Sequence, residues 1–287
     1  MRLVNFKDGE QIRLGIKKEQ GIIDVEKTAK SNSLEVPSTI EEVIAGGEQS
    51  IAQLQVLIGK EGTIISEEDI TYAPIVTNPE KIICVGLNYV NHAEESKMDI
   101  PTSPILFSKF NNALAAHKQN IALPKNAEKY DYEAELVIVI GKEAKYVSKE
   151  EALSFVFGYA VGNDLSARDL QFRTGQWLLG KTVDNFAPIG PEIVTADEVD
   201  PTKLNISCKV NGEIRQNANT KDMIFDCATI VSYLSQHMTL KPGDVIFSGT
   251  PDGVILGYSE ERQIWLKAGD EIEVTIENVG TLTNVLV

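Results

Sequence analysis

The chain has 287 residues, and its 27 Lys and Arg against 42 Asp and Glu give a formal net charge of −15. This excess of negative charge argues against nonspecific binding to nucleic acid or to an anionic membrane, because both require a positive surface. Hydrophobic residues make up 43% of the chain, which is typical of a globular protein and too many for a disordered one. Any anionic ligand must therefore be attracted by local cations.

The N-terminal sequence has no apolar run of signal-peptide length, and no stretch approaches the roughly 18 apolar residues of a membrane span. The three cysteines, Cys84, Cys208 and Cys227, are scattered and form no CxxC pair. This pattern is typical of reduced core thiols. We expect a cytoplasmic protein that has neither nucleic acid nor membrane as a partner.

The first part of the chain predicts a small α+β unit. Three short alternating runs separated by turn-forming sequences predict antiparallel strands; they cover residues 2–6, 11–16 and 21–25. Residues 40–62 have apolar residues at helical spacing, interrupted at Gly46 and Gly47. A proline-containing stretch follows and indicates a boundary. The predicted domains are a small N-terminal α+β domain (1–73) and a catalytic domain (74–287).

The second part is rich in strands, with a few short helices. Strands are predicted within residues 81–89, 132–141, 159–164, 244–249 and 270–287. Helices are predicted at 148–158, capped by Ser148 and Glu151, at 166–171, capped by Ser166 and Asp169, and within 223–238. The last helix places Ile224, Cys227, Ile230, Val231 and Leu234 on one face. Together these mostly antiparallel strands and few short helices indicate a β-rich α+β fold with a rolled sheet or a barrel-like core.

Glu133 and Glu135 are the first candidate functional residues. Residues i and i+2 of a strand point to the same face, so both carboxylates project together. They could be a solvated strand end, but the strand continues as LVIVI, which is typical of a buried strand. Two carboxylates that enter a core repel each other unless a cation lies between them.

Asp164 adds a third carboxylate at the end of another predicted strand. Three carboxylates without a His–Cys cluster form an all-oxygen site, which suits Mg²⁺ or Mn²⁺. Zinc is disfavoured because the Cys and His spacings that it prefers are absent.

His92 and Glu95 are three residues apart, so they would be neighbours on a helical turn. A carboxylate bonded to one imidazole nitrogen makes the other nitrogen a better base toward water. A surface pair without function is the simpler alternative for such a spacing.

Residues 175–182, GQWLLGKT, match the phosphate-loop pattern GxxxxGK[ST]. The preceding segment reads as helical, the loop contains bulky residues, and prolines follow it, so we interpret the match as coincidence. Lys181 itself is a candidate for stabilising an oxyanion beside the metal. The loop at 248–254, which contains Thr250, is either a plain turn or a source of donors for a ligand.

Six segments, taken in this order, resemble the fumarylacetoacetate hydrolase family. They are KIICVGLNYVNHAEE, DYEAELVIVIGKEA, FGYAVGNDLSARDLQ, GKTVDNFAPIGP, KVNGEIRQNANTKDMIF and LKPGDVIFSGTPDGV. The N-terminal unit resembles the small domain of many bacterial members. The resemblance implies a β-rich mixed roll that holds a divalent cation, usually Mg²⁺, and a homodimeric assembly.

The resemblance also implies roles for individual residues. The metal ligands would be Glu133, Glu135 and Asp164; the catalytic residues would be His92 and Glu95, on a short mobile helix, together with Lys181; and the substrate-binding residues would be Gln171, Thr250 and Asn88. One departure is Leu87, where many relatives carry Arg or Lys. The missing cation affects how a substrate carboxylate is held.

The predicted substrate is a small 2-oxo acid, and the predicted reaction is metal-dependent hydrolysis of a carbon–carbon bond in a 2,4-dioxo acid of the acylpyruvate or fumarylacetoacetate type. In it His92 would activate water, while Lys181 and the cation would stabilise the developing negative charge. Decarboxylation of oxaloacetate and isomerisation of 2-hydroxyhepta-2,4-diene-1,7-dioate remain alternatives at the same site. A non-catalytic binding protein is a remote alternative, because such a protein has no need of this set of residues.

Overall fold

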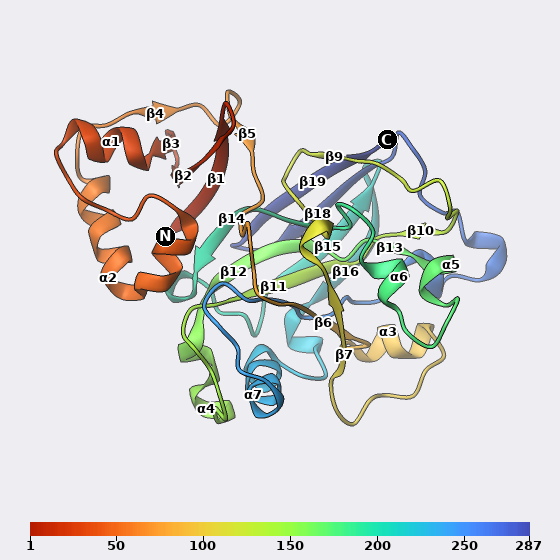
Figure 1. The fold of residues 1–287 in the computed structure, drawn as a ribbon. Coiled ribbons are helices and arrows are strands. Elements are labelled where there is room, and N and C mark those ends of the chain that lie inside the picture. Colours follow the sequence, from red (N-terminus) through yellow and green to blue (C-terminus); the bar gives the residue numbers. More distant parts are fainter.

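The N-terminal part folds as a small sheet covered by two helices in the computed structural model, which describes residues 1–287 (Figure 1). Its elements are β1 (Arg2–Asp8), β2 (Gln11–Lys18), β3 (Gly21–Asp24), α1 (Val25–Ser31), α2 (Ile40–Ile58), β4 (Ile64–Ile65) and β5 (Thr71–Tyr72). The three predicted strands are confirmed. The predicted interruption of the helix is also confirmed, because Gly47 in α2 has φ 53° and ψ −129°. Thr39 starts α2 with a capping box that includes Glu42.

The remainder of the chain supplies most of the strands. Its strands are β6 (Ile82–Gly86), β7 (Ile105–Lys109), β8 (Leu114–Ala115), β9 (Asn120–Ile121), β10 (Tyr130–Asp131), β11 (Ala134–Ile140), β12 (Val156–Asn163), β13 (Ser166–Ala167), β14 (Ala187–Thr195), β15 (Asn205–Val210), β16 (Glu213–Asn219), β17 (Val245–Phe247), β18 (Glu271–Ile276) and β19 (Gly280–Leu286). Its helices are α3 (Val90–Glu95), α4 (Lys149–Ala152), α5 (Arg168–Gln171), α6 (Leu178–Lys181) and α7 (Cys227–His237). The predicted α+β, sheet-rich fold class is confirmed.

Both parts of the chain contribute to one large mixed sheet. Its order is β4-β3-β2-β1-β14-β12-β11-β17-β6-β7, with β5 on β1 and β8 on β14. Most neighbours are antiparallel, whereas β17 and β6 are parallel. Because β1 pairs with β14, the N-terminal sheet continues directly into the sheet of the main part. The division into domains at residues 73 and 74 stays a prediction.

A second sheet covers the centre of the large one. Its order is β16-β15-β18-β19-β9, and β15, β18 and β19 pack on β11, β12 and β14. One buried apolar cluster joins the two sheets to α7 and includes Leu136, Ile206 and Ile230. The central strand β11 is buried along its whole length, which explains its run of apolar residues.

Two predicted helices differ in their bounds. Ser148 caps α4 as predicted, but the helix ends at Ala152, because the chain passes through a 3₁₀ turn and enters β12 at Val156. The predicted capping pair of Ser166 and Asp169 is wrong. Ser166 lies in β13 and its hydroxyl donates to the carbonyl of Asp164, so α5 begins two residues later.

The last predicted helix is confirmed, with a later start. Asp226 caps α7, whose buried face includes Cys227, Ile230, Val231 and Leu234, while Ile224 precedes the helix. All three cysteines are free and buried, as expected. None of the helices combines the length and the apolar character that crossing a bilayer would need.

Candidate metal and active site

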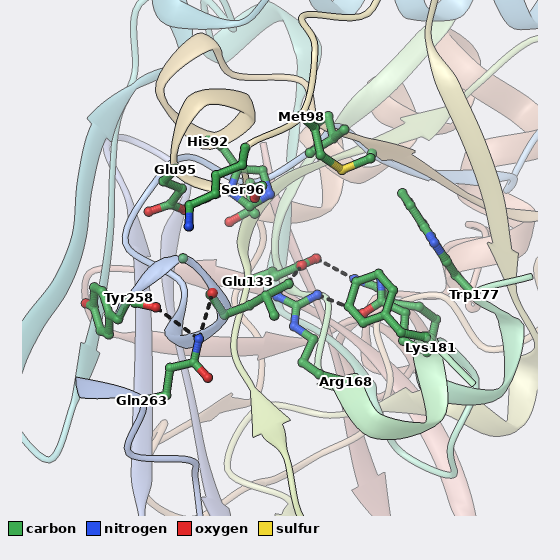
Figure 2. A pocket seen from close by; sticks show the side chains of 18 of the residues that line it. His92, Glu95, Ser96, Met98, Glu133, Arg168, Trp177, Lys181, Tyr258 and Gln263 are labelled. Carbon is green, nitrogen blue, oxygen red and sulfur yellow. Dashed lines mark hydrogen bonds and ion pairs between the residues drawn. The ribbon is translucent and has the colours of Figure 1, made fainter. Parts of the chain in front are cut away.

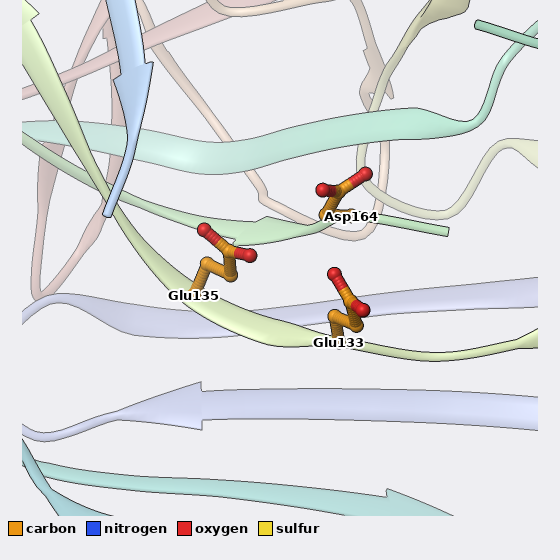
Figure 3. A group of neighbouring side chains, drawn as sticks. All are labelled: Glu133, Glu135 and Asp164. Carbon is orange, nitrogen blue, oxygen red and sulfur yellow. The ribbon is translucent and has the colours of Figure 1, made fainter. Parts of the chain in front are cut away.

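The three predicted metal ligands converge where β11 and β12 meet. The strands are antiparallel, with Ala134 opposite Asn163. Glu133 immediately precedes β11, Glu135 lies in it, and Asp164 immediately follows β12, where its N–H donates to the carbonyl of Glu133 at 2.9 Å. One oxygen from each of the three carboxylates lies within 4.8 Å of the others, and all three residues are buried (Figure 3). The strand period therefore predicted this convergence correctly.

Lys181, at the end of α6, lies against two of these carboxylates. Its Nζ is 2.6 Å from Oε2 of Glu133 and 3.0 Å from Oδ2 of Asp164. Burial lowers the pKa of Lys181, but the two carboxylates outweigh that effect and raise it, so the side chain is an ammonium. Burial has the opposite effect on an acid and raises the pKa of Glu133, but the nearby cations Lys181 and Arg168 outweigh it and lower this pKa to about 2.

Glu135 has no cationic partner. Its Oε2 accepts a hydrogen bond from the N–H of Gly249 at 2.6 Å. Burial and the neighbouring carboxylates of Asp164 and Glu133 raise the pKa of Glu135 well above its usual value. The site thus contains a carboxylate whose negative charge the protein alone does not balance.

A count of the buried charges gives the same result. At the site, four carboxylates are buried, namely Glu133, Glu135, Asp164 and Asp131. Three buried cations contact members of this group, namely Arg168, Lys181 and Lys109. One negative charge is left over. An uncompensated buried charge is strongly unfavourable, so the donor set fits a bound divalent cation. Its all-oxygen chemistry is that preferred by Mg²⁺ or Mn²⁺.

His92 and Glu95 form the predicted pair on helix α3. Nδ1 of His92 lies 2.9 Å from Oε1 of Glu95. A carboxylate only accepts hydrogen bonds, so Nδ1 donates and Nε2 keeps the free lone pair of a base. His92 is buried beside the same cavity as Glu133 (Figure 2). The pair is therefore not a solvated surface contact.

Glu95 also ties α3 to the loop that follows β17. The N–H of Gly253 donates to both carboxylate oxygens of Glu95, at 3.0 and 3.2 Å. Gly257 packs closely on the same carboxylate, and a Cβ at this glycine would lie 2.4 Å from Cδ of Glu95. The loop thus holds Glu95 in the orientation that it needs to bond His92.

These groups surround a cavity of about 530 Å³. Its polar side carries Glu133, Arg168 and Lys181, and His92 faces them from α3 (Figure 2). Its apolar side is formed by Val85, Leu87, Met98, Phe107 and Trp177. Leu87, where the family resemblance expected a cation, lines the cavity in a left-handed backbone conformation with φ 54°.

Gln171 and Thr250 lie where the sequence placed them, at the cavity. Oε1 of Gln171 accepts from Nη1 of Arg168 at 2.9 Å, which points the amide of Gln171 in a fixed direction. The hydroxyl of Thr250 donates to the carbonyl of Ala134 and accepts from Nε2 of Gln216, both at 2.9 Å. Thr250 can therefore offer a ligand only its remaining lone pair.

Asn88 does not line the cavity. It is fully buried, and its amide donates to the carbonyls of Phe225 and Ser248 while Oδ1 accepts from the N–H of Phe225. That Asn88 contacts substrate stays a prediction, and in this structure its amide bonds the backbone instead. Its side chain holds together backbone segments that are far apart in the sequence, a role that cannot be read from local sequence.

The sequence reasoning did not identify Arg168. Its Nε donates to Oδ2 of Asp131 at 2.9 Å, and its Nη2 lies 2.8 Å from Oε1 of Glu133. Asp131 in turn accepts from the N–H groups of Ile255 and Leu256. A signal was available, because Arg168 is three residues before Gln171 and shares one turn of helix with it.

The geometry agrees with comparisons to known proteins. The family model described as "Fumarylacetoacetate (FAA) hydrolase C-terminal" matches residues 81–287. The chain belongs to the fumarylacetoacetate hydrolase family. The predicted family is thus confirmed, and the match begins just before β6 and includes every residue placed at the cavity.

Named family members add detail. A fumarylacetoacetate hydrolase domain-containing protein 2 homolog from Dictyostelium discoideum is 53% identical over 224 residues, covering 74% of this chain and 72% of that one. A mitochondrial oxaloacetate tautomerase from Bos taurus is 40% identical over 296 residues, covering 100% of this chain and 92% of its own. A maleylpyruvate hydrolase from Sphingobium sp., solved with manganese(II) ion and pyruvate, has a TM-score of 0.82 and 30% identity, and covers 100% of this chain and 99% of its own.

These similarities do not test every expectation. The predicted homodimer and the cytoplasmic location stay predictions, and the name of the bovine family member places that protein in mitochondria. The family includes proteins named as tautomerases and as hydrolases, so membership does not by itself select one reaction.

Proposed function

We propose that this protein is a Mg²⁺- or Mn²⁺-dependent enzyme that interconverts the keto and enol forms of oxaloacetate or a closely related 2-oxo dicarboxylate. The observation that carries the proposal is the convergence of three buried carboxylates beside the His92–Glu95 pair in one cavity. The name of the bovine relative, which aligns over the whole chain, supports oxaloacetate as the substrate. The manganese and pyruvate in the Sphingobium hydrolase support a metal and a 2-oxo acid at this position.

Glu133, Glu135 and Asp164 would hold the cation. When bound, it supplies Lewis-acid polarisation of the 2-oxo group, which acidifies the neighbouring C–H. The remaining chemistry belongs to side chains of this chain. Lys181, held as an ammonium, supplies positive charge for an oxygen that becomes negative.

His92 would move the proton. Its Nε2 takes the proton from carbon 3, the C3–H electron pair forms the C2–C3 double bond, and the carbonyl electrons go to the oxygen on C2. Glu95 stabilises the imidazolium that results, because it bonds Nδ1. The imidazolium then returns the proton to that oxygen, which completes the enol without loss of any atom.

Hydrolysis of an acylpyruvate, the reaction first expected, remains a second candidate because the same His92–Glu95 pair can activate water. The proton then goes from water to Nε2, hydroxide attacks the distal carbonyl, and the C3–C4 bond breaks. Its electrons pass to C3, which is protonated to give pyruvate and a carboxylic acid. The apolar cavity wall around Leu87 and Trp177 favours an acyl group over a second carboxylate.

The two reactions are separated by their products. Purified protein with Mn²⁺ is given the enol form of oxaloacetate, while enol absorbance and pyruvate are followed together. Our proposal predicts rapid loss of the enol without matching release of pyruvate, and no acceleration after metal chelation. Pyruvate release that accounts for all enol lost would favour decarboxylation, and faster cleavage of acetylpyruvate would favour hydrolysis.

A further inference from the structure

Lys109, the last residue of β7, is a buried lysine that has no part in the proposed reaction. Its ammonium donates to three backbone carbonyls: those of Leu165 at 3.0 Å, of Phe186 at 2.7 Å, and of Lys181. Its Nζ also forms an ion pair with Oδ1 of Asp164 at 2.5 Å. The side chain does not line the cavity that holds the candidate active site.

The groups around Lys109 belong to separate parts of the site. Leu165 directly follows the metal-ligand candidate Asp164. Lys181 is the last residue of helix α6, and its side chain bonds Glu133 and Asp164. Phe186 directly precedes β14. One buried ammonium thus joins β7, the end of β12, the end of α6 and the start of β14.

We propose that Lys109 is a positioning residue that fixes the carboxylate of Asp164 for metal binding. Its ion pair with Oδ1 holds one side of the carboxylate, while Oδ2 lies 3.0 Å from Nζ of Lys181. One oxygen of this carboxylate lies within 4.8 Å of oxygens of Glu133 and Glu135. Groups that bond a metal ligand from behind typically contribute about 10- to 100-fold in metal affinity. The inference rests on the proposed metal site, but it concerns a different residue and a different measurement.

The direction in which Mn²⁺ affinity changes when Lys109 is replaced separates this positioning role from a purely electrostatic one. Lys109 is a cation next to a candidate cation site, so its charge alone repels Mn²⁺. Removing that charge without any change in geometry would therefore tighten Mn²⁺ binding. If Lys109 orients Asp164, its removal lets the carboxylate rotate, and Mn²⁺ binding weakens.

The test is calorimetric titration of Mn²⁺ into the metal-free full-length protein, compared with Lys109→Met. The matched control is Lys17→Met, which removes an ion-paired lysine that contacts Glu67 and Glu192, far from the metal-ligand candidates. We expect a dissociation constant about 10- to 100-fold larger for Lys109→Met and an unchanged value for Lys17→Met.

Each other outcome has a defined meaning. Unchanged or tighter binding by a folded Lys109→Met protein overturns the positioning role, even if its unfolding temperature is lower. If Lys109→Met does not fold, Lys109→Gln, which removes the charge but keeps an N–H donor, is titrated instead. Mn²⁺ binding equal to or weaker than wild type supports the positioning role, and tighter binding, the result of charge loss alone, overturns it. Failure of the unmodified protein to bind Mn²⁺ would contradict the proposed metal site itself.

Discussion

Glu95 bonds His92 through Nδ1 and the backbone of Gly253 through both of its carboxylate oxygens. The acceptor that orients the candidate base is therefore itself oriented by a loop from a distant part of the chain. This relationship makes the chemistry at His92 depend on residues that never touch the substrate.

Glu95→Gln is expected to lower kcat by about 10- to 100-fold, because the amide keeps the size of the side chain but no longer stabilises an imidazolium with a negative charge. Steady-state kinetics with saturating Mn²⁺ measure the effect. Glu94→Gln, on the exposed neighbouring residue of α3, is the control and should keep full activity. Equal activity of the two variants would contradict a role for the pair.

Gly257→Ala is expected to reduce activity as Glu95→Gln does, since the added Cβ would lie 2.4 Å from Cδ of Glu95 and must displace it. Calorimetric binding of Mn²⁺ should stay unchanged, because Glu95 is not among the metal-ligand candidates. Gly175→Ala, where a Cβ meets nothing within 4 Å, is the matched control. Normal turnover by Gly257→Ala would show that the position of Glu95 is unimportant.

Glu135→Gln is expected to abolish Mn²⁺ binding and yet, at a pH above the raised pKa of Glu135, to stabilise the metal-free protein by about 1–3 kcal/mol, because it removes an uncompensated buried charge. Denaturant unfolding with and without Mn²⁺ measures both effects. The raised pKa of Glu135 adds a pH dependence. As pH falls below that pKa, Glu135 takes up a proton in the folded protein but stays ionised in the unfolded chain. Metal-free wild type therefore gains stability, and its difference in unfolding free energy from Glu135→Gln shrinks. A stability difference between metal-free variant and wild type that does not grow as pH rises would contradict this view of the site.

His117 should make the protein less stable in mild acid. Burial lowers its pKa to about 4, and its Nδ1 accepts a hydrogen bond from the N–H of Thr283, which protonation would break. The unfolded chain takes up a proton near pH 6.5 but the folded protein does not, so stability is lost as pH falls from about 6.5 to about 4, by about 2–3 kcal/mol.

The measurement for His117 is the free energy of unfolding at pH 7.5 and at pH 5. His117→Asn, which keeps an acceptor for Thr283 but does not titrate, should reduce the difference between the two pH values. His237→Asn, at an exposed residue of α7, should leave the difference unchanged. An identical pH dependence in all three proteins would show that His117 does not contribute.

The candidate ligands were predictable because their arrangement depends on strand geometry. A period of two residues places Glu133 and Glu135 on one face, and the end of the next strand brings Asp164 to them. The spacing of His92 and Glu95 needed only one turn of helix. In both cases, short-range periodicity determines which side chains meet.

Lys109 and Asn88 show what the sequence could not reveal. The partners of Lys109 are backbone carbonyls of residues 56 to 77 positions away, and those of Asn88 lie 137 and 160 positions away. Such contacts exist only once the sheets have assembled. A polar residue beside a motif can therefore serve either the ligand or the fold, and only tertiary structure separates the two.

The pairing of β1 with β14 has a consequence for any attempt to shorten the protein. Residues 81–287, expressed alone, would leave the backbone of β14 around Ile193 without its hydrogen-bonding neighbour. They would also lose part of a buried apolar cluster that combines Leu3 and Val43 with Val139 and Val245. An unpaired strand beside bare apolar side chains invites association between molecules. We expect such a truncated fragment to aggregate, and the portion that matches the family model to be inseparable from the first seventy residues.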